Sequence, residues 1–399
     1  MEDLGIYLHL PFCQHRCGYC DFNTYSGINF LIPKYINALK QEILLFAASN
    51  SEWKNIQVRS IYFGGGTPSI IPSSSIGDLM NMIKDLFPVT KDCEITLEAN
   101  PGSMEKLDLE RLFDLGVNRL SIGVQSTNQD ELTLLERHHG YHEVCQAFKN
   151  AREVGFRTIS ADLIFGLPNQ RMEDWNRSLS DVLELNPEHI SLYALTLEKG
   201  TPLENRVARG LVPVPDPDLA AEMYAIARDR LGKSDFLHYE ISNWAIRDQF
   251  GVPLVSRHNR QYWLNQPYLG FGAGAHSFLG GFRFENIKNP VHYIDRIQQE
   301  KASNYPFTLS TAYQTEIDVI REMEETMMMG LRLLQEGVSL KRFQKRFGRD
   351  FRVVFSKELE KLMAMRLIQW KGNKNNKRLV LTPNAYFVAN QAFLEFISV

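Results

Sequence analysis

The amino-acid sequence predicts an α/β protein in which six repeated βα units form a parallel sheet and a small α+β domain follows. Three observations support this prediction. Short runs of β-branched and aromatic residues alternate with amphipathic stretches, turn residues separate them, and the C-terminal end differs in charge from the rest. Periodicity alone leaves open whether the six units form an open doubly wound sheet or a partial barrel.

The expected strands and helices alternate in strict order. Apolar runs typical of buried strands occupy residues 5–10, 59–63, 94–98, 119–124, 158–165 and 189–195. Helical spacing of apolar residues is found at residues 34–47, 74–86, 104–115, 141–154 and 173–185. Glycine and proline mark joins at residues 64–66, 100–102 and 166–168. Because the carboxyl ends of parallel strands meet at one edge, we expect the polar residues there to form one shared site.

The composition is typical of a folded, soluble protein. The chain has 399 residues, of which 44% are hydrophobic and 23% charged. It opens with Met1-Glu2-Asp3, which is acidic where a secretory signal would be basic, and no apolar run approaches a membrane span. We therefore expect a cytoplasmic protein with reduced thiols, in which clustered cysteines favour metal or redox chemistry over disulfides.

Positive charge is concentrated near the C-terminus, which indicates a separate module. Residues 338–380 hold thirteen of the 44 Lys and Arg residues but only three of the 47 Asp and Glu residues. The expected elements are helices from near residue 310 and at residues 340–347 and 355–365, strands at residues 367–370 and 378–381 around a turn at residues 372–376, and a last helix opened by Thr382-Pro383. This order predicts a winged-helix-like domain. The expected regions are a barrel at 1–236, an extension at 237–308 and the basic domain at 309–399.

Three of the five cysteines, Cys13, Cys17 and Cys20, form a C-x₃-C-x₂-C pattern after the first expected strand. A structural zinc site would need four ligands, usually as two separated pairs. Cys93 and Cys145 fall in or beside expected sheet and helix elements, where a structural role is expected. A [4Fe–4S] cluster takes one thiolate for each iron, so three thiolates would leave one iron open for another ligand.

This pattern, with Tyr19 before the last cysteine, resembles the cluster motif of the radical S-adenosylmethionine (SAM) superfamily. The resemblance implies a partial (β/α)₆ radical SAM barrel in which SAM chelates the open iron through its amino and carboxylate groups. Further motifs occur in family order at residues 7–13, 64–68, 98–101, 123–126 and 162–168. Together they resemble the oxygen-independent coproporphyrinogen III oxidase family along essentially the whole chain.

The resemblance also assigns a SAM pocket. The implied residues are Tyr7, Tyr19, Gly65, Gly66, Thr67, Glu98, Gln125, Arg137, Asp162 and Ala194. The glycine loop would receive the SAM amino group and Arg137 its carboxylate, charge against charge. Some of these positions also have a structural explanation: a tight turn for the glycines, a solvated helix position for Arg137, and ordinary core for Tyr7 and Ala194. Asp162 lies in an apolar strand, so a polar partner or ligand is expected for it.

Two departures and one motif select a branch of this family. The oxidase branch usually carries another cysteine where this chain has Phe22, and it has a segment before the cluster strand for which this sequence leaves no room. The motif His258-Asn259-x-x-Tyr262-Trp263 resembles that of the HemW-type heme chaperones. Residue types alone favour a polar, aromatic strand end that stabilises the open side of the barrel. The resemblance favours heme binding and leaves the ligand open, with His9 and His276 as further candidates.

The leading hypothesis is a heme chaperone that binds heme, a [4Fe–4S] cluster and SAM, and transfers heme to apo-hemoproteins, among them membrane respiratory proteins. The alternative is a radical SAM coproporphyrinogen III oxidase; a third class is a radical SAM enzyme acting on nucleic acid. The basic domain fits a solvated face or a complement to the acidic barrel. Attraction to anionic lipid or to an acidic electron donor is about as plausible as nucleic-acid binding. Whether SAM is cleaved, and the oligomeric state, are left open.

Overall fold

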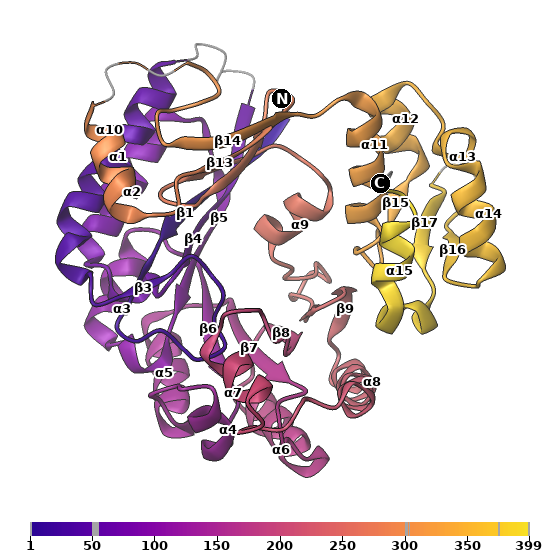
Figure 1. Cartoon of the computed structure of the whole chain (residues 1–399), viewed down its shortest axis with the longest axis horizontal. Helices are drawn as coiled ribbons and strands as arrows, with labels where there is room; N and C mark the ends of the chain where they lie inside the picture. Colours follow the sequence, from indigo (N-terminus) through magenta and orange to yellow (C-terminus); the bar gives the residue numbers. More distant parts are fainter. Residues whose placement is uncertain (1, 50–55, 300–301, 303, 374–375, 398–399) are drawn as a thin grey trace.

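The computed structural model describes residues 2–49, 56–299, 302, 304–373 and 376–397 (Figure 1). A curved sheet wrapped by helices forms the larger part of the molecule, and a smaller domain built from the C-terminal residues lies beside it. Met1 and residues 374–375 of the expected hairpin turn lie outside the described residues. No helix in the described part of the chain combines the length and apolar character needed to cross a bilayer.

The six expected strands form the centre of the sheet and are parallel neighbours in sequence order, which confirms the predicted partial barrel. They are β1 (Glu2–Leu10), β4 (Ile56–Gly65), β5 (Val89–Ala99), β6 (Arg119–Gln125), β7 (Ile159–Phe165) and β8 (His189–Ala194). Their apolar side chains form the main hydrophobic core with those of the covering helices. Parallel strands that are buried on both faces have near-continuous runs of apolar residues in the sequence, and these runs allowed the strands to be predicted.

The five expected helices cover the outer face of this sheet (Figure 1). They are α1 (Ile32–Ala48), α2 (Ser73–Leu86), α3 (Lys106–Asp114), α5 (Tyr141–Val154) and α6 (Met172–Glu184). In the barrel region, three further helices among the described residues were not predicted: α4 (Gln129–Leu134), α7 (Pro202–Ala208) and α8 (Pro217–Lys233). The segment 199–218 was expected to be a connection because it is rich in proline. Pro202 and Pro217 instead open helices, after caps from Thr201 and Asp216.

The expected extension adds strands to both edges of the same sheet. The added strands are β9 (Leu237–Glu240), β10 (Asn243–Ala245), β11 (Tyr268–Phe271), β12 (His276–Leu279), β13 (Phe282–Asn286) and β14 (Thr311–Glu316). β10 pairs with β8, whereas β11 lies parallel to β1 and leads outward through β12 and β13 to β14. Helix α10 (Pro290–Gln299) packs against α1. Since β14 belongs to this sheet, the expected helical start near Ser310 is wrong, and we propose a domain boundary after β14.

The motif that begins at His258 lies on a helix, α9 (Arg257–Trp263), so the expected strand end at this position is wrong. The Glu94 carboxylate accepts the backbone N–H groups of Arg257 and His258, both at 3.0 Å, and Ser256 caps the helix through Asn259. Free N–H groups at a helix start favour a carboxylate at this position. These contacts tie the start of α9 to β5, and the helix also packs against β1 and β4.

The C-terminal domain has its own hydrophobic core, formed by residues between Met323 and Phe396. Its elements are α11 (Val319–Gly330), β15 (Val338–Ser339), α12 (Leu340–Phe347), α13 (Phe351–Val354), α14 (Ser356–Ala364), β16 (Ile368–Lys371), β17 (Arg378–Leu381) and α15 (Ala389–Leu394). Helices followed by a β-hairpin confirm the winged-helix-like prediction. β15, which pairs with β17, was not predicted, and Thr382 precedes a short 3₁₀ helix (Pro383–Val388) before α15.

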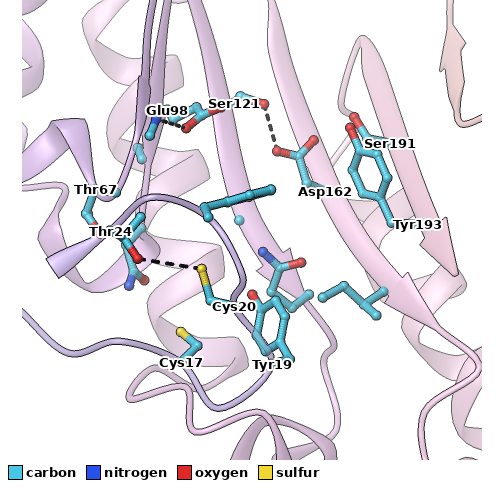
Figure 2. A pocket seen from close by; sticks show the side chains of 18 of the residues that line it. Cys17, Tyr19, Cys20, Thr24, Thr67, Glu98, Ser121, Asp162, Ser191 and Tyr193 are labelled. Atoms are coloured by element: carbon cyan, nitrogen blue, oxygen red, sulfur yellow. Dashed lines mark hydrogen bonds between the residues drawn. The ribbon is translucent and has the colours of Figure 1, made fainter. Parts of the chain in front are cut away.

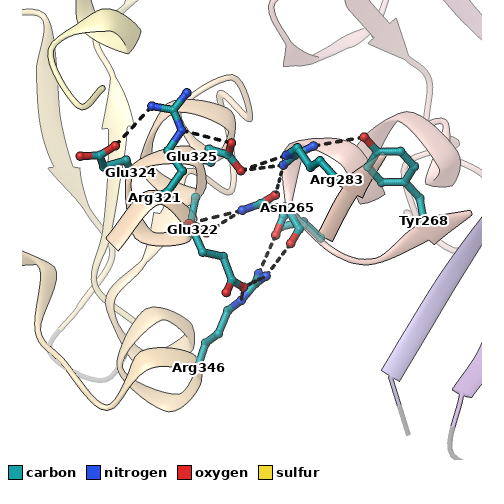
Figure 3. Close-up of polar contacts among 10 residues, drawn as sticks. Asn265, Tyr268, Arg283, Arg321, Glu322, Glu324, Glu325 and Arg346 are labelled. Carbon is teal, nitrogen blue, oxygen red and sulfur yellow. Dashed lines mark hydrogen bonds and ion pairs between the residues drawn. The ribbon is translucent and has the colours of Figure 1, made fainter. Parts of the chain in front are cut away.

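Polar contacts join this domain to the sheet (Figure 3). Arg283 of β13 donates to the Glu325 carboxylate of α11 at 2.7 Å and to the Tyr268 hydroxyl at 3.1 Å. Arg346 of α12 pairs with Glu322 and donates to the Asn265 carbonyl at 2.7 Å. The ion pair across this interface thus joins an arginine of the sheet to a carboxylate of the C-terminal domain, and Arg346 reaches a backbone carbonyl. Complementation of an acidic barrel by the basic residues of the domain stays a prediction.

Candidate functional site

A cavity of about 500 Å³ opens at the carboxyl ends of the parallel strands, where the sequence placed the shared site (Figure 2). Its lining comes from the cysteine loop and from β4 to β8. Of the residues proposed for cluster and SAM, those that line it are Cys13, Cys17, Cys20, Tyr19, Gly65, Gly66, Thr67, Glu98, Gln125, Arg137, Asp162 and Ala194. Residues that are far apart in the sequence thus line the same cavity.

The cysteine loop is held at both ends. β2 (Phe12–Cys13) pairs with β3 (Tyr25–Ser26), which closes the loop across the mouth of the barrel. Cys13 is buried, whereas Cys17 and Cys20 are half-buried, and all three thiols are free. No group of three or more His, Cys, Asp or Glu side chains among the described residues is arranged for a single metal ion. A cubane spreads its thiolates over separate irons, so three separated thiols facing one cavity fit a cluster with one open iron.

The glycine loop lies against the cysteine strand. The backbone N–H groups of Gly66 and Thr67 donate to the carbonyls of Leu10 and Phe12 at 2.9 and 2.8 Å. A Cβ on Gly66 would lie 2.5 Å from the Phe12 carbonyl oxygen, well inside contact distance. Glycine at position 66 is therefore required for the two loops to approach each other.

The variant Gly66→Ala is expected to lose about 1–3 kcal/mol in free energy of unfolding, because the added methyl group pushes the cysteine strand outward. The same displacement would lower the yield of reconstituted cluster. Gly102→Ala is the matched control, since its added Cβ would meet no atom within 4 Å. Urea unfolding and iron content of both variants test this prediction. An equal effect in the two variants would contradict it.

Two carboxylates face the cavity from β5 and β7, the strands on either side of β6. Glu98 accepts hydrogen bonds from the Tyr62 hydroxyl at 2.8 Å and the Gly65 N–H at 3.1 Å, and burial raises its pKa to about 7. Asp162 accepts from Ser121 at 2.7 Å and from Ser160 at 2.9 Å, and burial raises its pKa also. The expected polar partners of Asp162 are thus two serines. A cationic ligand group entering beside Glu98 would favour its ionised form.

The raised pKa of Glu98 predicts a pH dependence of stability in cofactor-free protein. Between its ordinary value of 4.5 and about 7, the folded protein binds more protons at Glu98 than the unfolded chain. The free energy of unfolding should therefore fall as pH rises through this window, by about 1–2 kcal/mol once solvent in the cavity is allowed for. Glu98→Gln should remove the contribution of Glu98 and so reduce the fall measured by urea unfolding between pH 5 and 8; Glu240, whose pKa burial raises to about 6, keeps its own contribution. Glu173→Gln, at an exposed position, should keep the full fall.

Several polar atoms in the cavity wall lack partners within the described chain. Arg137 approaches the Cys17 thiol at 3.6 Å and donates to the Gly123 carbonyl at 3.1 Å, but its Nε atom is buried without a partner. The Asn100 side-chain oxygen and the Thr96 hydroxyl are buried and unpaired as well. Buried polar groups are normally satisfied, so these atoms fit a wall that receives a polar ligand.

The floor of the cavity contains polar residues that the sequence analysis missed. Ser160 bonds His189 at 2.8 Å, and His189 bonds the Tyr239 hydroxyl at 2.8 Å. Ser121, Ser160, His189 and Ser191 all line the cavity. The sequence did carry a signal for them. Polar residues occupy every second position of the fifth and sixth strands, beginning at Ser160 and His189, and alternate side chains of a strand lie on the same face of the sheet.

A second cavity, of about 690 Å³, adjoins the first between the cysteine loop and β12. The residues that line both cavities are Arg16, Asp21, Phe22, Thr24, Gly65 and Glu98. Tyr7, which the resemblance assigned to the SAM pocket, lines this second cavity, and its hydroxyl lies 3.0 Å from His9 Nδ1. The two cavities form a connected space at the barrel mouth.

The residues of the heme-candidate motif separate on α9. Asn259 lines the first cavity and Tyr262 the second, while the Trp263 ring packs under Arg332 at 4.3 Å. His258 is buried; its Nδ1 lies 2.9 Å from Ser60 Oγ and its Nε2 2.9 Å from the Tyr262 hydroxyl. With both ring nitrogens engaged, this histidine fits the structural explanation better than iron ligation, which remains an untested prediction.

Known proteins match the chain throughout its length. A family model described as the radical SAM superfamily matches residues 7–182, and one described as the HemN C-terminal domain matches residues 317–388. The heme chaperone HemW of Bacillus subtilis is 36% identical over 98% of both chains, and that of Lactococcus lactis is 33% identical over 98% of this chain and 96% of its own. The solved coproporphyrinogen III oxidase HemN of Escherichia coli superimposes with a TM-score of 0.82 at 22% identity, covering 99% of this chain and 90% of its own.

Fold, cysteine loop and cavity together define a protein of the radical SAM superfamily. Within that superfamily, the heme chaperones HemW are similar to this chain along almost its whole length. The chain belongs to the family of the heme chaperone HemW.

Proposed function

We propose that this protein is a heme chaperone that binds heme, carries a [4Fe–4S] cluster with SAM in its barrel, and transfers heme to apo-hemoproteins. The observation that carries the proposal is the 36% identity over 98% of the chain to a protein named as a heme chaperone. The second cavity supports it, because it offers room for a large ligand beside the first. The E. coli oxidase is 22% identical, so its similarity indicates the fold and carries no argument for its reaction.

The first cavity supplies the residues for the resident cofactors. Cys13, Cys17 and Cys20 would hold three irons, leaving the fourth for SAM. Glu98 and the glycine loop would receive the SAM amino group, and Arg137 its carboxylate. When bound, the cluster and SAM would supply one-electron chemistry. The chain's own contribution is to orient both groups and to exclude water at the strand ends.

The cellular setting is proposed on chemical grounds. A chain whose cluster-binding cysteines are free fits a reducing compartment, and we propose the cytoplasm. The acceptors would include respiratory hemoproteins at the membrane. Basic residues of the C-terminal domain that make no ion pair could approach anionic lipid there by electrostatic attraction.

The decisive experiment uses full-length protein reconstituted anaerobically with iron and sulfide. Hemin titration should give a Soret band, and the loaded protein should pass heme to apomyoglobin as a model acceptor. Incubation with coproporphyrinogen III, SAM and a low-potential reductant should give no protoporphyrinogen. Absence of the Soret band, or formation of protoporphyrinogen, would overturn the proposal.

A further inference from the structure

We propose that heme binds in the second cavity, with the imidazole of His276 as an axial ligand to its iron. This inference deepens the proposed function and rests on it. The cavity, of about 690 Å³, lies within the range of about 300–1,000 Å³ usual for cofactor pockets. Because it shares Phe22, Gly65 and Glu98 with the first cavity, a ligand bound there would lie beside the cysteine loop.

The three candidate histidines differ in the availability of their ring nitrogens. His258 makes hydrogen bonds through both nitrogens, and His9 contacts the Tyr7 hydroxyl at 3.0 Å and the Asn23 carbonyl at 2.9 Å. Both rings are buried. The side chain of His276 is 62% exposed and lines the second cavity. Of the three, His276 can therefore reach an iron without breaking internal contacts.

The surroundings of His276 resemble those of histidines that ligate metals. Its Nε2 lies 3.2 Å from the Glu285 carboxylate, and the other ring nitrogen makes no hydrogen bond to a described residue. Ligating histidines usually donate their second ring N–H to a carboxylate, which fixes the ring and strengthens the ligand. With Nε2 held by Glu285, Nδ1 is the nitrogen left to face the iron.

The charges and aromatic groups of the cavity match a porphyrin. Arg16 and Lys288 line it, and two cations can pair with the two heme propionates; the carboxylates of Asp21 and Glu98 line the cavity as well. Phe22, which is 65% exposed, offers an apolar face to the macrocycle. The walls are tied together, since the Asn23 amide of the cysteine loop donates to the Lys288 carbonyl at 3.0 Å.

A competing imidazole site lies on the other flank of the cysteine loop. His15 and His138 stack there with ring centroids 4.4 Å apart. The adjoining cavity has a volume of about 110 Å³, below the range of cofactor pockets. This surface therefore cannot enclose a porphyrin, although its histidines are close to Cys17.

The test is hemin titration of full-length, anaerobically reconstituted protein, followed by difference absorption spectra and electron paramagnetic resonance (EPR). His276→Ala should weaken hemin binding by roughly tenfold or more and remove the signature of imidazole ligation. His276→Cys should restore binding with a Soret band moved to the position of a thiolate ligand. His292→Ala is the matched control, because His292 is exposed on α10 and lines neither cavity.

The outcomes separate this inference from the proposed function. If wild-type protein binds hemin and passes it to apomyoglobin while His276→Ala keeps the wild-type spectrum and affinity, the inference fails and the chaperone function stands. Loss of the imidazole signature in His258→Gln, with His276→Ala unchanged, would also overturn it. If wild-type protein binds no hemin, the proposed function fails and the inference fails with it.

Discussion

Cys17→Ala should leave reconstituted protein without its [4Fe–4S] signal, with roughly a tenth or less of the wild-type iron. Each of the three thiolates would hold a different iron, so loss of one leaves two irons without a protein ligand. Cys17 is half-buried on the closed loop between β2 and β3, and Arg137 lies 3.6 Å from its sulfur. Iron analysis and EPR after anaerobic reduction would measure the effect.

Stability is expected to change little in this variant, because a substitution on a half-buried loop usually shifts the free energy of unfolding by about 0.5 kcal/mol or less. Cys145→Ala, at a half-buried position on α5 outside both cavities, is the control and should keep the full cluster. A Cys17→Ala protein that retains wild-type iron and EPR intensity would exclude the three-cysteine cluster. Hemin titration of the same variant would show whether heme binding requires the cluster.

Glu42→Ala should destabilise the protein by about 3–5 kcal/mol, the cost of breaking a buried, charged hydrogen-bond network. Glu42 of α1 is buried, and burial raises the pKa of its carboxyl. Its carboxylate accepts from the Gly272 N–H at 2.9 Å, the Tyr293 hydroxyl at 2.7 Å, the Asn286 amide at 2.8 Å and the Ser310 hydroxyl at 2.7 Å. One side chain thus joins α1 to the strands that form the wall of the second cavity.

Urea unfolding would measure this loss, and two variants make the result specific. Glu42→Gln keeps an acceptor oxygen and should lose less than Glu42→Ala. Asp78→Ala removes an exposed partner of Lys40 and should change the free energy of unfolding by about 1 kcal/mol or less. If Glu42→Ala unfolds at the same urea concentration as Asp78→Ala, the network contributes no net stability.

The barrel could be predicted because its signals are local. Parallel strands buried on both faces leave continuous apolar runs, and amphipathic helices leave a 3.6-residue period, so the order of six units was readable. The short helices α4 and α7 left no such period. Pro202 and Pro217 were taken as signs of a connection, although proline in the first turn is compatible with a helix.

The candidate site was predictable in part for the same reason. Cys13, Cys17 and Cys20 lie within eight positions of one another, and Glu98 and Gln125 end expected strands. The resemblance to a known family then assigned roles that spacing could not supply. Tyr7 lines the second cavity, which shares Glu98 with the first, so its assignment to SAM stays a prediction.

The sequence by itself determined the βα order, the position of the cysteine loop and the separate basic domain, because each is encoded by residues close together in the chain. Only the tertiary structure decided that the extension lengthens both edges of one sheet and that α9 packs against β1 and β4. It also decided which imidazole is free: His258 meets Ser60, nearly two hundred residues away, whereas His276 faces a cavity. Burial and hydrogen bonding of a side chain depend on partners brought together by folding, and no local pattern records them.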